Sequence, residues 1–297
     1  MHNNARSEVS GMRHRHTSGA NALLGYPADA RLLIINADDF GMCHAINAGI
    51  LRSLTEGVVS STSVMPPCPW ALHAMHLLKE NPDIPFGVHL TVINEHVLYR
   101  WRPLTSRDRV PSLIDETGYC YDEERLPEFL AQAKLNELEL EFRAQIETVL
   151  AAGLEPTHLD WHCLSVSERV EIFELTLGLA QEYGLAVRVA EHSLIETVQP
   201  QNLPTDDHDL LDSFTLDNVG KADRYAVLLH NLPVGLSEWA VHPGLDDAEL
   251  RAFEPDGADV RQTDLDFLTS AEAREIIQRE EITLVSYKPL QRAWQER

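Results

Sequence analysis

The sequence has few cysteines and few positive charges. Its four cysteines, Cys43, Cys68, Cys120 and Cys163, are widely spaced and form no CxxC pair. It therefore predicts neither a disulfide framework nor a thiolate zinc site, and such cysteine use is typical of the reducing cytoplasm, where we expect this protein. Lys and Arg number 24 against 47 Asp and Glu, which gives a formal net charge of −23. This deficit argues against binding nucleic acid or an anionic membrane surface through a broad basic face.

Long hydrophobic runs are also missing. No segment approaches the roughly 20 consecutive apolar residues that span a bilayer, and the polar start of the chain has no apolar core long enough for a signal peptide. We expect residues 1–28 to form a flexible polar tail. At 297 residues in all, the rest of the chain is long enough to bury a large core, so we expect residues 29–297 to form a single domain.

Short apolar runs alternate with segments of helical periodicity along this domain. The run Leu32–Ile35 is too short and too apolar for an amphipathic helix, and its β-branched content fits a strand buried on both faces of a parallel sheet. Residues 126–152, in contrast, repeat apolar side chains at three- and four-residue steps, which predicts one long helix. Strands separated by helices indicate βαβ units. The sequence thus predicts the α/β class, as an irregular (β/α) barrel of mostly parallel strands.

Two adjacent carboxylates, Asp38 and Asp39, follow the first predicted strand. In α/β folds the carboxyl ends of strands are where ligands bind, so acids placed there are good candidates for a functional site. The alternative interpretation of the pair is a helix N-cap followed by a turn residue.

The strand predicted at residues 157–163 carries three polar side chains on one face, since residues two apart point the same way: His158, Asp160 and His162. A hydrogen-bonded polar cluster is the alternative. His89 also ends a predicted strand, where the alternative interpretation is a core histidine hydrogen-bonded to the backbone. Asp39, His89 and His162 all lie at predicted strand ends of one sheet. Two neutral imidazoles and one carboxylate suit a divalent cation of borderline softness, with positions left for water and substrate.

His242 lies in the turn Val241-His242-Pro243-Gly244 after another predicted strand. Its charge can change near neutral pH, which makes it a candidate proton donor to a leaving group, or else a structural turn residue. The irregular segment 94–123 contains Tyr99 and Trp101. These aromatic rings either stack on a sugar ring or pack in an ordinary way.

Four motifs together resemble the YdjC family of carbohydrate deacetylases, and they occur in the family's order between residues 31 and about 290. They are Asn36-Ala37-Asp38-Asp39-Phe40-Gly41, Gly87-Val88-His89-Leu90, Thr157-His158-Leu159-Asp160-Trp161-His162 and Val241-His242-Pro243-Gly244. The family commonly has serine where this chain has Trp161 and histidine where it has Leu164, so the third motif is a variant.

The resemblance implies an irregular (β/α) barrel that removes acetyl groups from N-acetylated sugars such as chitooligosaccharides, using one divalent metal ion, Zn or Mg. It implies Asp39 and His89 as metal ligands together with a histidine of the third motif. We favour His162 over His158 because it is nearer the open end of the strand. Asp38 becomes the general base, and His158 and Asp160 become supporting or substrate contacts. The resemblance is also compatible with a homodimer.

The predicted activity is therefore metal-assisted hydrolysis of an amide in a small carbohydrate substrate, with His242 protonating the departing amine. Two alternatives stay open. A metal-dependent phosphoesterase uses similar Asp and His ligands, but usually adds phosphate-binding glycines or clustered basic residues, which are not found near these motifs. A non-catalytic sugar-binding protein could use the same fold, although it would be expected to lose the base or the ligands.

Overall fold

The computed structural model describes residues 19–189 and 191–296. A sheet of eight parallel strands forms its centre, in the order β7-β6-β3-β2-β1-β9-β8 with β10 beside β1, while β4 and β5 pair separately. The strands are β1 (Arg31–Phe40), β2 (Ser61–Val64), β3 (Phe86–Leu90), β4 (Ile93–Asn94), β5 (Tyr121–Asp122), β6 (His158–Trp161), β7 (Ala186–Val187), β8 (Leu211–Asp212), β9 (Gly235–Val241) and β10 (Ile282–Leu284).

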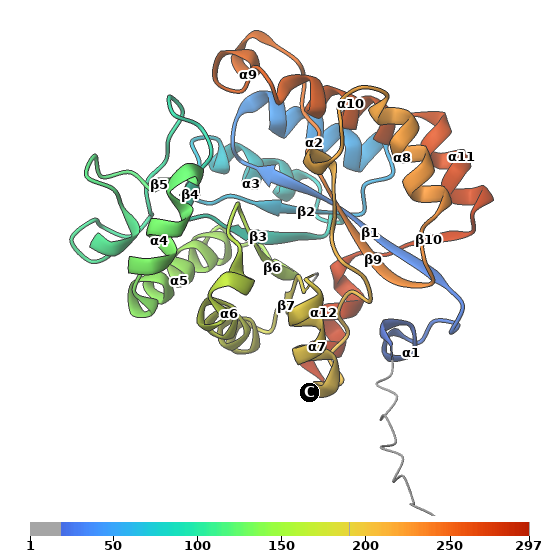
Figure 1. The fold of residues 1–297 in the computed structure, drawn as a ribbon, viewed down its shortest axis with the longest axis horizontal. Helices are drawn as coiled ribbons and strands as arrows, with labels where there is room; N and C mark the ends of the chain where they lie inside the picture. The colour runs from blue at the N-terminus through green and yellow to red at the C-terminus, as the bar shows by residue number, and fades with distance from the viewer. Residues whose placement is uncertain (1–18, 190, 297) are drawn as a thin grey trace, which may run out of the picture.

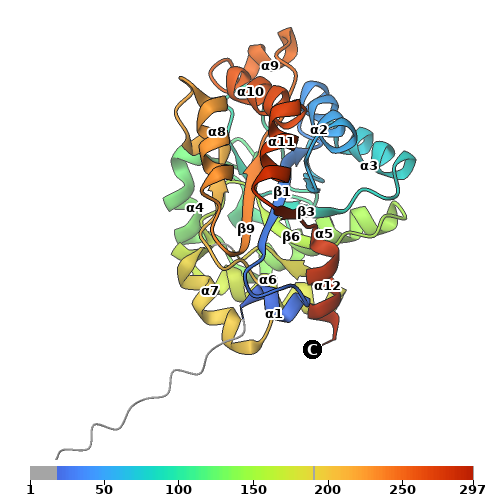
Figure 2. The ribbon, with the colours of Figure 1, turned by 90° about the vertical axis from the view of Figure 1, so that its right-hand side faces the viewer.

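Helices surround the sheet on its outer side (Figures 1 and 2). They are α1 (Ala20–Leu24), α2 (His44–Glu56), α3 (Ala71–Glu80), α4 (Leu126–Gln132), α5 (Leu135–Ala151), α6 (Val170–Tyr183), α7 (His192–Val198), α8 (Lys221–His230), α9 (Ala248–Phe253), α10 (Ala258–Leu268), α11 (Ala271–Arg279) and α12 (Tyr287–Gln295). Single-turn 3-10 helices lie at Pro111–Leu113, Glu123–Arg125, Val166–Glu168, Gln199–Gln201 and Ser213–Thr215. Within the described part of the chain, no helix is both long and apolar enough to cross a bilayer.

The central strand is β1, as the apolar run Leu32–Ile35 predicts. These four residues are fully buried, and the strand pairs with β9 along most of its length, with β10 at its start and with β2 at its end. The sheet curls into a half-barrel of parallel strands, which confirms the predicted fold class (Figure 1). Because the strands are parallel, their carboxyl ends meet along one rim, where β1, β3, β6 and β9 each deliver polar side chains.

Two segments differ from expectation. The predicted helix at 126–152 is divided into α4 and α5, because Lys134 donates its backbone N–H to the Ser112 hydroxyl and Ser112 donates its own to Glu137, so a neighbouring loop occupies the first turn of α5. In the predicted tail, residues 1–18 lie outside the described part of the chain. Residues 19–28 include α1, whose Ala20 is buried in an apolar cluster with Leu32 and Leu290, so packing begins before residue 29.

The contact between β3 and β6 depends on a residue without a side chain. A Cβ at Gly87 would lie 2.5 Å from both Cε1 and Nε2 of His158 on the neighbouring strand. The imidazole of His158 stacks on Tyr287, with ring centroids 3.7 Å apart, and its Nδ1 lies 3.0 Å from the Thr157 hydroxyl. This ring is therefore held on its other sides and cannot retreat.

We expect Gly87→Ala to lower the free energy of unfolding by about 1–3 kcal/mol, the usual cost of overpacking a core. Urea unfolding checks this. Gly178→Ala is the matched control: this glycine lies inside α6, nothing lies within 4 Å of the added Cβ, and alanine in a helix interior should stabilise by roughly 0.5–1 kcal/mol. Equal effects of the two substitutions would contradict the proposed clash.

Candidate metal and active site

The two carboxylates at the end of β1 face the same cavity. In a regular strand, neighbours point to opposite faces. Here Asp39 has a φ of 73°, in the left-handed region, and the register with β2 shifts between Ala37 and Phe40. This irregularity interrupts the alternation, so that Asp38 and Asp39 both line a cavity of about 360 Å³ at the rim of the sheet.

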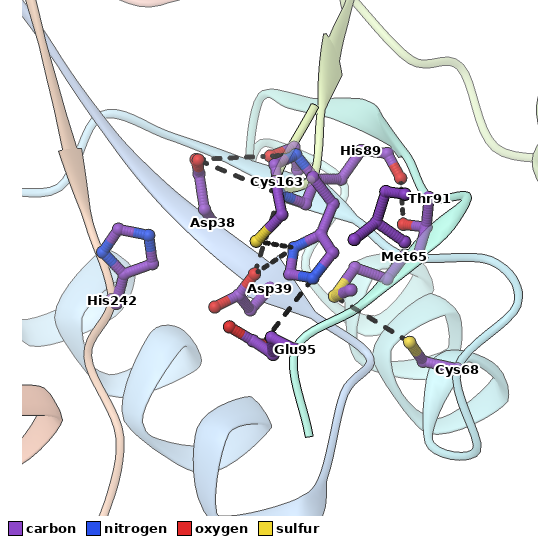
Figure 3. Close-up of polar contacts among 12 residues, drawn as sticks. Asp38, Asp39, Met65, Cys68, His89, Thr91, Glu95, Cys163 and His242 are labelled. Atoms are coloured by element: carbon purple, nitrogen blue, oxygen red, sulfur yellow. Dashed lines mark hydrogen bonds and ion pairs between the residues drawn. The ribbon is translucent and has the colours of Figure 1, made fainter. Parts of the chain in front are cut away.

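Three donor atoms, from β1, from β3 and from the residue after β6, meet in this cavity. Figure 3 labels two of these residues, Asp39 and His89. Asp39 Oδ1 lies 3.2 Å from His162 Nδ1 and 3.6 Å from His89 Nε2, and the three ligand atoms are all within 4.8 Å of one another. Each side chain is almost fully buried. Two imidazole nitrogens and one carboxylate oxygen, with the cavity on the remaining side, fit a divalent cation with positions left for water and substrate.

Each of the two histidines has a carboxylate near its second ring nitrogen. His89 turns Nδ1 to Asp160 Oδ1 at 3.0 Å, which leaves Nε2 for the cavity. His162 turns Nε2 toward Glu95 Oε1 at 3.7 Å and Nδ1 toward Asp39. Burial lowers the pKa of His162, but the Glu95 and Asp39 carboxylates outweigh it and raise the pKa above its ordinary value. A carboxylate at hydrogen-bond distance, as Asp160 is from His89, fixes the orientation of a histidine ligand, whereas Glu95 lies beyond that distance from His162.

Arg188, the residue after β7, is the cation that balances the inner carboxylates. Its Nη1 and Nη2 each donate to one oxygen of Asp38 at 2.8 Å, its Nε donates to Glu238 at 2.8 Å, and its Nη2 lies 3.0 Å from Asp160. Burial would raise the pKa of Asp38 and of Asp160, but the guanidinium holds both pKa values below the ordinary range. Glu238 is different, since burial raises its pKa to about 7.

Arg261, on α10, neutralises the outer carboxylates. It donates to Asp39 Oδ2 at 2.8 Å and to Glu254 at 2.7 Å. Burial would raise the pKa of Asp39, yet Arg261 and His162 bring that pKa well below its ordinary value. The pairing engages only one oxygen of Asp39, whereas Arg188 engages both oxygens of Asp38. Of the two adjacent acids, Asp39 therefore has an oxygen available to a cation at the imidazoles.

His242 lies on the opposite side of the cavity, directly after β9 (Figure 3). Its Nδ1 is 2.9 Å from the Ser213 hydroxyl, and its backbone N–H donates to Asp264 at 2.7 Å. With Nδ1 occupied by a partner, Nε2 is the nitrogen available to a bound molecule.

The other residues singled out from the sequence lie outside the lining of this cavity. His158 is fully buried against Tyr287, and Asp160 lies behind His89. Trp101 is buried with its indole N–H donated to Ile93 and its ring edge-on to His162. Tyr99 stacks on Phe253 and donates its hydroxyl to the carbonyl of Met42.

Three residues of the site were missed in the sequence. Arg188 had a signal, because a charged residue inside the apolar run Ala186–Val189 is expected to have a buried partner. Arg261 had none, since it lies on a polar helix 222 residues from Asp39 in the chain. Glu95 follows the two-residue strand β4, which is too short to be recognised from its pattern.

Comparisons with known proteins identify the same family that the sequence motifs resemble. The model of the YdjC-like protein family matches residues 32–279. The chain belongs to this family. A carbohydrate deacetylase of Geobacillus stearothermophilus is 36% identical over 221 residues, covering 74% of this chain and 82% of that protein. A chitooligosaccharide deacetylase of Yersinia enterocolitica is 32% identical over 266 residues, covering 86% and 98%.

Among solved structures, this YdjC-like chain is similar to an Enterococcus faecalis protein named for cellobiose-phosphate cleavage. The two share 29% sequence identity and superpose with a TM-score of 0.75, covering 88% of this chain and 99% of that one. This chain therefore shares its half-barrel fold with that solved structure.

The dependence of the site on Arg188 gives a prediction about stability. In Arg188→Met, three buried carboxylates lose their cation, and we expect a loss of about 3–5 kcal/mol in the free energy of unfolding at pH 7. The folded-state pKa values of Asp38 and Asp160 then rise above the unfolded values, and that of Glu238, which is already raised, rises further. A raised pKa contributes stability that is lost as the pH rises through it. The deficit relative to wild type should accordingly shrink between pH 7 and pH 5.

Urea unfolding with chelator present measures this deficit at each pH. Arg143→Met is the control, because Arg143 pairs with Glu139 and Glu182 on the surface, where such pairs contribute about 0–1 kcal/mol. A deficit for Arg188→Met that does not change with pH would mean that these carboxylates do not depend on the guanidinium.

Proposed function

We propose that this chain is a metal-dependent hydrolase that removes the acetyl group from N-acetylated sugars or short oligosaccharides of the chitooligosaccharide type. One observation carries the proposal: the donor set Asp39, His89 and His162 shares its cavity with Asp38, a carboxylate held by Arg188. The names of the Geobacillus and Yersinia relatives support the same activity.

We assign three roles to the residues of the cavity. Asp39, His89 and His162 hold a divalent cation, zinc being favoured by the two imidazoles while the carboxylate also tolerates magnesium. When bound, the cation supplies Lewis-acid polarisation of the acetyl carbonyl and activates water. Asp38 accepts the proton of the attacking water, for which it is ionised because Arg188 lowers its pKa. Oδ1 of Asp38 accepts from Arg188 and also from Asn36 at 2.6 Å, whereas Oδ2 accepts from Arg188 and keeps a second lone pair for this proton.

His242 completes the reaction on the far side of the cavity. Its Nδ1 is held by Ser213, so Nε2 delivers a proton to the amine as the C–N bond breaks. The products are acetate and an amino sugar. The side chains that line the cavity include five carboxylates, Asp38, Asp39, Glu95, Glu123 and Asp212, and they favour the departing ammonium group.

The same acidic lining weighs against phosphate ester cleavage. The name of the Enterococcus structure speaks of cellobiose-phosphate cleavage without saying which bond is cleaved. A phosphate dianion needs free donors or cations. Arg188, the cation of the lining, is already engaged by Asp38, Glu238 and Asp160. Acetate release from chitobiose, with and without chelator, tests the proposal. Phosphate release from cellobiose phosphate without any acetate release from chitobiose would overturn it.

The two adjacent acids should respond differently to the same substitution. We expect Asp39→Asn to weaken metal binding, because it removes a ligand charge, and Asp38→Asn to keep the metal but lose turnover by a factor of about 10² to 10⁴. Elemental analysis of dialysed protein gives the metal content. His89→Ala should lose metal as Asp39→Asn does. Equal occupancy in the Asp38 and Asp39 variants would reverse their assigned roles.

His242→Gln tests the proton donor. We expect turnover to fall by about 10² or more with metal content unchanged, since the residue donates a proton without ligating the cation. A substrate whose leaving group needs no protonation, such as a nitrophenyl acetate ester, should lose much less rate. Equal losses on the amide and the activated ester would indicate a role other than proton donation.

A further inference from the structure

We propose that Glu95, His162 and Cys163 form a second cation position, selective for thiophilic ions such as Zn²⁺ and Cd²⁺, that overlaps the first position through the shared ligand His162. We call this group the Cys163 site. It goes beyond the proposed hydrolase, which uses neither Glu95 nor Cys163 as a ligand. Its consequence for the enzyme is that an ion which activates at the first position inhibits when it is in excess.

The geometry of the Cys163 site suits one ion. Glu95 Oε1 lies 3.7 Å from His162 Nε2, Cys163 Sγ lies 4.0 Å from His162 Nδ1, and one donor atom from each residue lies within 4.8 Å of the other two. The first two distances involve different nitrogens of the ring, so an ion that all three residues bind at about 2.0–2.3 Å takes one of these nitrogens and requires the His162 ring to turn. Figure 3 shows Cys163 and Glu95 on the same side of the rim as Asp39.

Two atoms of the Cys163 site are buried without a hydrogen-bond partner, namely Glu95 Oε1 and His162 Nε2. The His162 side chain is only 3% exposed. A buried polar atom without a partner costs about 1–3 kcal/mol, so a ligand that satisfies both atoms is stabilised here. These two atoms face each other, and the third donor of the group is a thiol.

The backbone turns Cys163 into the cavity. Its φ is 49°, in the left-handed region. This backbone conformation is uncommon for residues other than glycine, asparagine and aspartate. The thiol lines the same cavity as Asp39 and His162, whereas Cys43, Cys68 and Cys120 are buried elsewhere. Of the four thiols, Cys163 is thus the one that reaches the site.

The charges around the Cys163 site favour a cation. Arg261 Nη2 is 3.9 Å from Glu95 Oε1, but this guanidinium already pairs with Asp39 and Glu254. His96 Nε2 also lies 3.4 Å from Glu95 Oε1. Three carboxylates therefore share one guanidinium, with the imidazoles of His96 and His162 beside them, and the carboxylates attract a cation.

The donor types determine which ions bind. Thiolate and imidazole select zinc and cadmium, whereas magnesium prefers oxygen ligands and water. On binding, the S–H bond of Cys163 breaks, a sulfur–metal bond forms and the proton leaves to solvent. An ion there draws His162 away from Asp39, so it competes with the cation at the first position.

Cadmium titration of the full chain tests the Cys163 site through the ultraviolet charge-transfer absorption of a cadmium–thiolate bond. We expect the band in wild type and its loss in Cys163→Ser. Cys120→Ala, which removes another buried thiol, should keep the band. Circular dichroism confirms that each variant is folded. Absence of the band in wild type, or its survival in Cys163→Ser, would overturn the proposal.

Glu95→Gln provides a second variant that retains every thiol. We expect Cd²⁺ affinity, measured against a chelating indicator, to fall at least several-fold, while an affinity equal to that of wild type would rule out Glu95 as a ligand. The absorption band does not depend on turnover, so its outcome is separate from the test of acetate release. If both proposals hold, excess Zn²⁺ inhibits wild type more strongly than Cys163→Ser.

Discussion

The rim of the sheet depends on the pairing of buried carboxylates with two guanidinium groups. Arg188 binds Asp38, Asp160 and Glu238, and Arg261 binds Asp39 and Glu254. Several carboxylates crowded into one buried region would otherwise repel one another or become protonated. With the guanidinium groups in place, Asp38 and Asp39 are both ionised within a small cavity. The arginines therefore make it possible for the proposed base and the proposed cation ligand to be neighbours in the chain.

The way in which each arginine pairs separates the roles of these neighbours. Asp38 gives both oxygens to Arg188, while Asp39 gives Oδ2 to Arg261 and turns Oδ1 to the imidazoles. The left-handed backbone at Asp39 makes this possible, because a regular strand would point the two carboxylates to opposite faces. The irregular backbone at Asp39 thus gives two identical side chains different hydrogen-bond partners and different surroundings.

Much of this arrangement follows from sequence pattern, and the rest from tertiary contacts that leave no local trace. The strand-end rule predicted that Asp39, His89 and His162 would come together, because each lies at the end of a predicted strand in one parallel sheet. It could not predict Arg261, which reaches Asp39 from a helix far along the chain. Helical periodicity likewise predicted one helix over 126–152, since the interruption arises from hydrogen bonds with Ser112 rather than from the helix's own residues.

The two histidines of the proposed first cation position, His89 and His162, are not held equally. His89 is fixed by Asp160 at 3.0 Å, and Asp160 in turn lies 3.0 Å from Arg188, so this ring is part of a continuous buried network. His162 faces Glu95 at the longer distance of 3.7 Å and has the Cys163 thiol on its other nitrogen. A ring with a loosely placed partner can rotate with little loss of hydrogen bonding. His162 is accordingly the ligand that can exchange between two ions, whereas His89 fixes the position of the first.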